Sequence, residues 1–206
     1  MLADTLRAIA AALETPVVAF LLFLIAAVIF LLGTVIVEFF AEHRHLKAVL
    51  PKLADRLRDE EDTAEVIATS GLLKRQRIAL TELTKHPQLT SAAREALAIK
   101  LVTAERAHYE SIVRLTDIIA RLGPMFGLLG TLIPLGPGII ALGRGDTYTL
   151  SMSLLVAFDT TIAGLISAAA AFVISAIRKK WYGDYMSSLE MVMECVLEAE
   201  NERSVQ

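Results

Sequence analysis

The chain has 206 residues, of which 55% are hydrophobic and 21% are charged, and a formal net charge of −3. Its mean hydropathy of +0.56 excludes a disordered chain and argues against a water-soluble domain. The single cysteine excludes an intramolecular disulfide framework, four histidines without a Cys/His cluster argue against a zinc site, and no basic face points to nucleic acid. We therefore expect an integral membrane protein that needs no metal and no cofactor.

Three apolar runs are long enough to cross a bilayer, which takes about 20 helical residues. The first occupies residues 16–40 and has no charge before Glu38. It is too long for the apolar core of a signal peptide and has no positively charged leader, so we expect a retained anchor. The second covers 122–142 without an ionisable group, and the third, at about 150–177, contains one charge, Asp159. The predicted fold is all-α, with three transmembrane helices.

The remaining segments divide the chain around these runs. We expect an N-terminal segment at 1–15, a cytoplasmic helical region at 41–116, a two-span hairpin at 117–178 and a cytoplasmic C-terminal helix at 179–206. Most of the 20 Lys and Arg residues lie in 41–116, and a basic cluster of Arg178, Lys179 and Lys180 stands where the tail opens. Because Lys and Arg favour the cytoplasmic side, we expect a multi-pass inner-membrane protein. Its N-terminus and hairpin turn would lie outside, and its long segment and tail in the cytoplasm.

Apolar residues that recur every three or four positions predict one continuous helix from about Thr90 into the second span, because no helix breaker comes before Gly123. His108 lies on the apolar stripe of this helix, which favours a packed, hydrogen-bonded core histidine over a ligand or a pH sensor. A stripe on one face of the tail predicts a packed helix there. Its members are Met186, Leu189, Met193 and Val196.

The second span carries small residues on one face, at a spacing of three or four. They are Gly123, Gly127, Gly130, Thr131, Pro134 and Gly138. Such a stripe lets two helix backbones approach closely in lipid, so tight packing alone is one interpretation and a pore lining is the other. Pro134 and Pro137 remove backbone donors and are expected to bend the outer part of the helix.

The third span has a comparable stripe, formed by Thr160, Gly164, Ser167, Ala168, Ala171 and Ser175. Thr161 lies beside this stripe, and Asp159 precedes it near the middle of the membrane. A carboxylate within the hydrocarbon costs about 2.5–3.5 kcal/mol on insertion scales. Asp159 is therefore either a hydrogen-bonded structural acid at a helix contact or part of an ion path. Two hydroxylated faces that meet around a mid-membrane acid fit an ion pathway between subunits.

Two of these segments resemble a known family. Residues 123–131, Gly-Pro-Met-Phe-Gly-Leu-Leu-Gly-Thr, resemble the second-span motif of the MotA/TolQ/ExbB proton-channel family, and residues 157–165, Ala-Phe-Asp-Thr-Thr-Ile-Ala-Gly-Leu, resemble its third-span motif. The match is strong over about 121–182, and three spans are closer to ExbB and TolQ than to the four-span MotA. The resemblance implies a pentamer around two single-span partner helices of the ExbD/TolR/MotB type, with ion flow driving rotation or a conformational cycle.

The resemblance also implies roles for individual residues. The pore threonines of the family map onto Thr131 and Thr161. ExbB-like members have a glutamate five residues before the third-span threonine, whereas this chain has Val156 there and Asp159 two residues before Thr161. Either the acid has moved by about one turn, or the aspartate of the partner helix carries the ion unaided. We expect Thr131, Thr161, Asp159 and Thr160 to form an ion pathway, with Asp159 as a candidate carrier or gate. The residues expected to pack the helices or line the pore are Gly123, Gly127, Gly130, Pro134, Gly164 and Ser167.

The expected function is that of a stator subunit, the ion-channel half of a motor driven by the proton-motive force. H⁺ is the expected ion, and Na⁺ stays open because hydroxyl and carboxylate groups serve both. Two alternatives remain: a non-conducting scaffold that holds a partner helix, and a small transporter whose cavity between subunits binds a solute. An enzyme is not expected, because the sequence has no nucleophile–base pair, metal set or phosphate loop.

Overall fold

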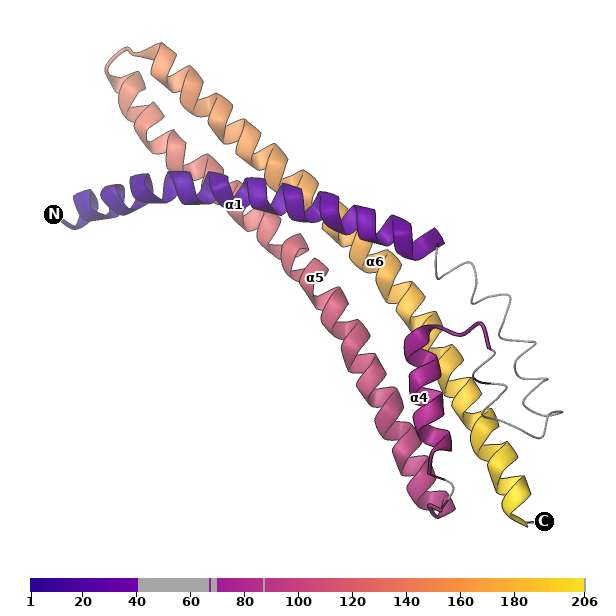
Figure 1. Ribbon diagram of the computed structural model, residues 1–206. Coiled ribbons are helices and arrows are strands. Elements are labelled where there is room, and N and C mark those ends of the chain that lie inside the picture. Colours follow the sequence, from indigo (N-terminus) through magenta and orange to yellow (C-terminus); the bar gives the residue numbers. More distant parts are fainter. Residues whose placement is uncertain (41–66, 68–69, 87, 206) are drawn as a thin grey trace. The chain divides into compact units, whose positions relative to one another are not determined.

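The computed structural model describes residues 1–40, 67, 70–86 and 88–205 (Figure 1). Residues 41–66, which belong to the predicted cytoplasmic helical region, lie outside the described residues. The elements of the described part are the helices α1 (Leu2–Glu38), α4 (Lys74–Thr84), α5 (Ser91–Gly143) and α6 (Thr147–Val205), with no strand among them. The all-α prediction is confirmed for this part of the chain.

Three of these helices are long and apolar enough to cross a membrane, within Thr5–Glu38, Ser91–Gly143 and Thr147–Glu198. The prediction of three transmembrane helices is therefore confirmed. In hydrocarbon each backbone N–H and C=O group needs a partner inside the protein, and a helix provides one within the segment itself. The helix α1 begins before the predicted apolar run and holds Pro16 inside it.

The helix α5 is unbroken over 53 residues, as the apolar periodicity predicts. It contains three prolines, Pro124, Pro134 and Pro137. Since proline has no N–H group, the carbonyl four residues before it has no donor within the helix. For Pro134 and Pro137 these carbonyls belong to Gly130 and Ile133.

A short turn joins α5 to α6, which runs back antiparallel to it (Figure 1). Gly145 in this turn has a φ of 78°, which glycine adopts at little cost because it has no Cβ. Asp146 then caps α6. Its Oδ1 accepts a hydrogen bond from the Thr149 amide at 3.0 Å and its Oδ2 one from the Thr149 hydroxyl at 2.5 Å. These bonds stabilise the carboxylate, so they hold the pKa of Asp146 below its usual value.

Two compact units make up the chain, and the first consists of residues 1–34 and 114–176. In this unit α1 buries every third or fourth residue, namely Val17, Leu21, Leu24, Val28 and Leu31. Phe20 of α1 contacts Phe126 of α5, with their ring centroids 4.1 Å apart. The other face of α1 is apolar and exposed, with Phe23 64% and Phe30 72% exposed. This is the pattern of a helix that packs on protein along one side and meets lipid along the other.

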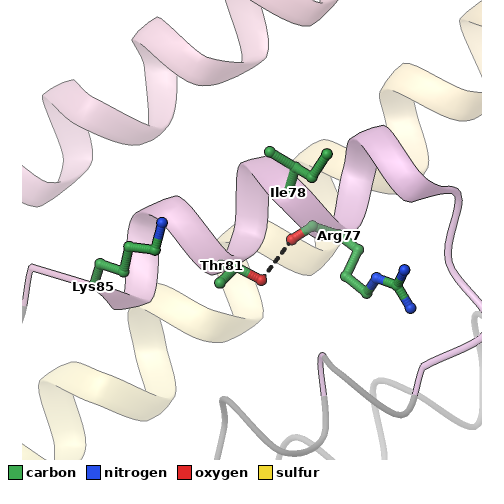
Figure 2. A pocket seen from close by; sticks show the side chains of 4 residues that line it. All are labelled: Arg77, Ile78, Thr81 and Lys85. Atoms are coloured by element: carbon green, nitrogen blue, oxygen red, sulfur yellow. Dashed lines mark hydrogen bonds between the residues drawn. The ribbon is translucent and has the colours of Figure 1, made fainter.

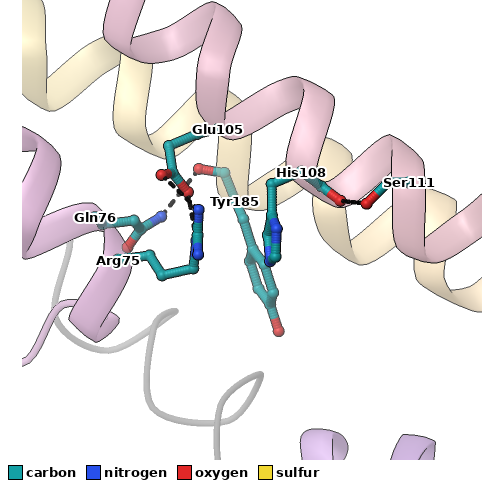
Figure 3. A network of polar contacts seen from close by, with 6 residues as sticks. All are labelled: Arg75, Gln76, Glu105, His108, Ser111 and Tyr185. Carbon is teal, nitrogen blue, oxygen red and sulfur yellow. Dashed lines mark hydrogen bonds and ion pairs between the residues drawn. The ribbon is translucent and has the colours of Figure 1, made fainter.

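The second unit consists of residues 35–113 and 177–206. In it α4 packs against α5 and α6, and Leu80 and Leu83 of α4 are fully buried. Gln76 is buried as well and donates from Nε2 to the main-chain oxygen of Tyr185 at 3.0 Å (Figure 3). Arg75, one residue earlier, forms an ion pair with Glu105 of α5 at 2.9 Å. A buried hydrogen bond and a surface ion pair therefore connect α4 to both long helices.

The predicted packing of the tail is confirmed, because all members of its stripe are buried: Met186, Leu189, Met193 and Val196. The prediction of a core histidine is wrong, since His108 is only partly buried. The hydrogen bond at this residue runs from the Ser111 hydroxyl to the main-chain oxygen of His108, at 2.7 Å (Figure 3). Among the described residues no group of three His, Cys, Asp or Glu side chains could hold a metal ion.

Candidate functional site

The small-residue faces of α5 and α6 pack directly against each other in the first unit. A Cβ added to Gly123 would lie 2.6 Å from the main-chain oxygen of Gly164, and one added to Gly164 would lie 2.5 Å from that of Gly123. Real Cβ atoms do not come so close to a backbone oxygen, so both positions require glycine. Gly127 has more room, because its Cβ would lie 3.5 Å from the Cα of Gly164. We call this contact the glycine seam.

Thr160 belongs to the interior of the glycine seam. A Cβ on Gly130 would lie 2.5 Å from the Thr160 Cβ, and Thr160 is only 6% exposed. Its hydroxyl donates back along α6, 2.9 Å from the Val156 oxygen and 3.0 Å from the Ala157 oxygen. Ser167 is buried in the same way, and its hydroxyl donates to the oxygen of Ala163 at 2.8 Å.

Thr131 and Thr161 lie at the edge of the seam. Each follows a seam residue, Gly130 or Thr160, and one residue turns a helix by about 100°. Both side chains are half-buried. The Thr131 hydroxyl donates to the Leu128 oxygen at 2.7 Å and the Thr161 hydroxyl to the Ala157 oxygen at 3.0 Å. The hydroxyl oxygens keep lone pairs that can accept a further hydrogen bond.

The register of the hairpin follows from its contacts. Gly123 meets Ala168, Gly130 meets Thr160 and Gly138 meets Ser153. Both helices rise by the same amount per residue, so in this antiparallel pair the two residue numbers of each contact add to nearly the same total. By the same rule Thr131 and Asp159 lie at one level, and Pro134 lies opposite Val156.

Asp159 points away from the seam and is exposed in the single chain. It shares that surface with large apolar side chains, since Leu155, Phe158, Ile162 and Ile166 are all more than half exposed. The Asp159 side chain makes no hydrogen bond or ion pair with another residue of the described part. The structural acid at a helix contact, one of the two interpretations of the sequence, is therefore not formed between α5 and α6.

A carboxylate at the other end of the seam was not expected from the sequence. Ser175, which is 2% exposed, donates to Oδ1 of Asp117 at 2.5 Å. The predicted second span began after Asp117, so this residue was counted as part of no stripe. The register of an antiparallel pair was the available signal, because it places Asp117 opposite Ser175.

A second missed pair lies in the second unit. Arg178 was counted as part of the basic cluster that sets the direction of the chain, but its side chain is 6% exposed. Its Nε lies 3.4 Å from Oε2 of Glu38, which is also mostly buried. Beside this pair the rings of Phe39 and Trp181 stack, with centroids 5.7 Å apart.

Two cavities were not expected from the sequence. One, in the second unit, has a volume of about 380 Å³ and is lined by Arg77, Ile78 and Thr81 of α4 and by Lys85, which follows this helix (Figure 2). Its charged side chains are both cations, so it is not a candidate for an H⁺ or Na⁺ path. The other lies in the first unit, beside Pro134 and Val156.

Comparison with known proteins agrees with the motifs of the hairpin. Residues 68–191, more than half of the chain, match the sequence model of the MotA/TolQ/ExbB proton channel family. The chain belongs to this family. It is therefore a multi-pass membrane protein whose glycine seam, Thr131 and Asp159 all lie within the part that the MotA/TolQ/ExbB family shares.

One curated relative is similar to part of the chain. The biopolymer transport protein exbB1 of Vibrio cholerae is 30% identical over 122 residues, which are 55% of this chain and 52% of that protein. The chain thus spans about half the length of this MotA/TolQ/ExbB relative.

Proposed function

We propose that this chain is the channel-forming stator subunit of a motor driven by the proton-motive force. The observation that carries the proposal is the register of the glycine seam. It brings a hydroxyl, on Thr131, and a carboxylate, on Asp159, to one level of the membrane, with both side chains outside the intrachain contact. The proton-channel family to which the chain belongs supports the same function.

The exposure of Asp159 supports an oligomer. A carboxylate that faces hydrocarbon costs about 2.5–3.5 kcal/mol, and the apolar surface around Asp159 offers it no partner within the chain. A second copy of the chain or a partner helix would cover it. We propose a homo-oligomer, a pentamer by resemblance, around single-span helices of the ExbD/TolR/MotB type, in an inner membrane with the N-terminus outside.

In this assembly Asp159 alternates between its protonated and ionised forms as each ion passes. Thr131 and Thr161 cannot carry charge, but their oxygens can order water or coordinate a dehydrated cation beside the carboxylate. Thr160 and the seam glycines hold the two helices in register. The seam therefore sets the distance between hydroxyl and carboxylate, and it takes no part in the transfer itself.

The test is ion flux in liposomes that contain the complex purified from its own host. Thr161→Ala and Asp159→Asn should each abolish H⁺ flux while the complex keeps its composition on native mass spectrometry. Thr103→Ala is the matched control, because the Thr103 hydroxyl also donates to a carbonyl of its own helix, that of Ile99 at 2.8 Å, outside the hairpin.

Three outcomes would decide against the stator. Wild-type flux equal to that of a Thr131/Thr161/Asp159 triple variant would favour the non-conducting scaffold. Thermal stabilisation by a solute, with no flux of H⁺ or Na⁺, would favour the transporter. A monomer or dimer that survives crosslinking in the membrane would contradict the oligomeric channel itself.

A further inference from the structure

A cavity of about 280 Å³ lies in the first unit, between α1 and the turn end of the hairpin. Its lining residues are Glu14, Pro134, Pro137, Tyr148, Thr149, Met152, Ser153 and Val156. They come from all three helices of this unit. Glu14, which is exposed in the single chain, is the one acidic residue of this lining, and no Lys or Arg belongs to it.

The described structure gives the Glu14 side chain no polar partner. Its side chain makes no ion pair or hydrogen bond with another described residue, although it lies within a helix apolar enough to cross a membrane. The nearby N-terminus of α6 would favour a carboxylate, but Asp146 already caps it through Thr149. Glu14 is therefore not needed as a cap.

The other polar groups around the cavity are oxygen acceptors. The hydroxyl hydrogens of Thr149 and Ser153 are already donated, to Asp146 at 2.5 Å and to the Thr149 main-chain oxygen at 3.0 Å. Their oxygens remain available as acceptors, together with the oxygen of Tyr148. A carboxylate among neutral oxygens is the set of groups that binds a hard cation.

The cavity is also close to the proposed ion path. Val156 precedes Asp159 by three residues and Pro134 follows Thr131 by three residues. At 1.5 Å per residue the cavity wall thus lies about 4.5 Å along the helices from the level of Thr131 and Asp159. Val156 is apolar, so the carboxylate of this lining comes from α1.

We propose that Glu14 and this cavity form a loading site for a monovalent cation, H⁺ or Na⁺, at the turn end of the hairpin. The cation binds to the Glu14 carboxylate, with the neutral oxygens of α6 around it, and passes from there to the level of Asp159. This transfer rests on the proposed function, whereas the binding site itself does not.

Labelling with dicyclohexylcarbodiimide tests the site, because this apolar reagent modifies protonated carboxyl groups within a membrane. In membranes of the producing host, mass spectrometry should find the adduct on Glu14. The adduct should disappear in Glu14→Gln and persist in Asp159→Asn. Protection by Na⁺ would identify a sodium site, and labelling that Na⁺ does not change would identify a proton site.

A cavity-filling variant provides the matched control. Val156→Phe should suppress labelling of Glu14, whereas Val173→Phe should not, because Val173 is 54% exposed on the same helix and lines no part of the cavity. Labelling confined to Asp159, or equal labelling of Glu14 in both variants, would overturn the site.

Flux separates the site from the proposed function. Loss of H⁺ or Na⁺ flux in Glu14→Gln, with the complex intact, supports loading through Glu14. Equal flux in Glu14→Gln and wild type overturns loading and leaves the stator intact. The wild-type complex could also conduct nothing while its Glu14 is labelled and Val156→Phe suppresses that labelling. This result would support the binding site and contradict the stator.

Discussion

Arg178 of α6 and Glu38 at the end of α1 form an ion pair whose side chains are only 6% and 13% exposed, with Nε 3.4 Å from Oε2. Removing one member of a buried pair leaves the other charge without compensation, which costs far more than the pair itself contributes. Arg178→Ala should therefore lower the free energy of unfolding by about 3 kcal/mol.

Thermal unfolding in detergent measures this loss, with Lys180→Ala as the control because Lys180 is exposed two residues further along α6. A double variant, Arg178→Met with Glu38→Gln, should recover much of the stability, since it leaves no buried charge. Equal destabilisation by Arg178→Ala and Lys180→Ala would show that the pair is not buried in the protein.

Gly→Ala substitutions should lower stability inside the glycine seam and raise it, or leave it unchanged, elsewhere on the helices. Gly→Ala inside an exposed helix normally stabilises it by about 1 kcal/mol. In the seam the added Cβ meets the main chain of α6 at Gly123 and the Thr160 side chain at Gly130. Gly123→Ala and Gly130→Ala should therefore each destabilise by about 1–3 kcal/mol. The measurement is again the thermal unfolding midpoint.

The control for the seam is Gly183→Ala on α6, because nothing lies within 4 Å of a Cβ at that position. This variant should be neutral or more stable than the wild type. If Gly123→Ala behaves like Gly183→Ala, the two helices do not approach as closely as the structure has them.

Two neighbouring residues of α4 should differ sharply in their effect on stability. Gln76→Ala removes a buried donor to the main-chain oxygen of Tyr185 and should cost about 1–3 kcal/mol. Arg75→Ala breaks an ion pair in which the arginine side chain is 47% exposed, and exposed pairs contribute only about 0–1 kcal/mol. Chemical denaturation of both variants compares the two losses directly, and a larger loss for Arg75→Ala would contradict the burial of Gln76.

The Asp146 cap predicts a loss of stability in acid. Folding lowers the pKa of Asp146 below the ordinary value of 3.8. The contribution of Asp146 to the free energy of unfolding is therefore complete above the unfolded pKa. The contribution is lost as the pH falls through the folded pKa. Asparagine also caps helices but does not ionise, so Asp146→Asn should flatten this part of the acid profile.

The thermal midpoint of the wild type and of Asp146→Asn, measured from pH 6 downward, checks this sign. The two curves should converge in acid, because the protonated Asp146 no longer holds its charge-assisted bonds. Thr149→Val should flatten the acid profile in the same way, since it removes the hydroxyl that donates a hydrogen bond to Asp146. Parallel curves would mean that Asp146 keeps its ordinary pKa.

Local patterns in the sequence determined the helices of this protein. Three apolar runs predicted three membrane helices, and an uninterrupted period predicted α5 as one helix from the cytoplasmic region into the second span. Helix formation depends on the apolar length of a segment and on side chains three or four residues apart. Such information is present in any window of the sequence, so it needed no knowledge of the fold.

The positions of the stripes were predictable in the same way, but the roles of their members were not. The sequence placed Thr160 both in the small-residue stripe and in the expected ion pathway, and only the contact with Gly130 shows that Thr160 lies inside the seam. The direction in which Asp159 points was open for the same reason. A helix face is buried only where a second helix packs on it, and it stays exposed elsewhere.

Contacts between distant segments depended on the tertiary structure alone. Ser175 and Asp117 are 58 residues apart in the chain, and Arg178 and Glu38 are 140 apart. The register of the hairpin decides the first pair, and the packing of α1 on α6 decides the second. The cavity around Glu14 belongs to the same class, because its lining comes from three helices. Sequence periodicity specifies the faces of each helix, whereas the free energy of packing selects which faces meet.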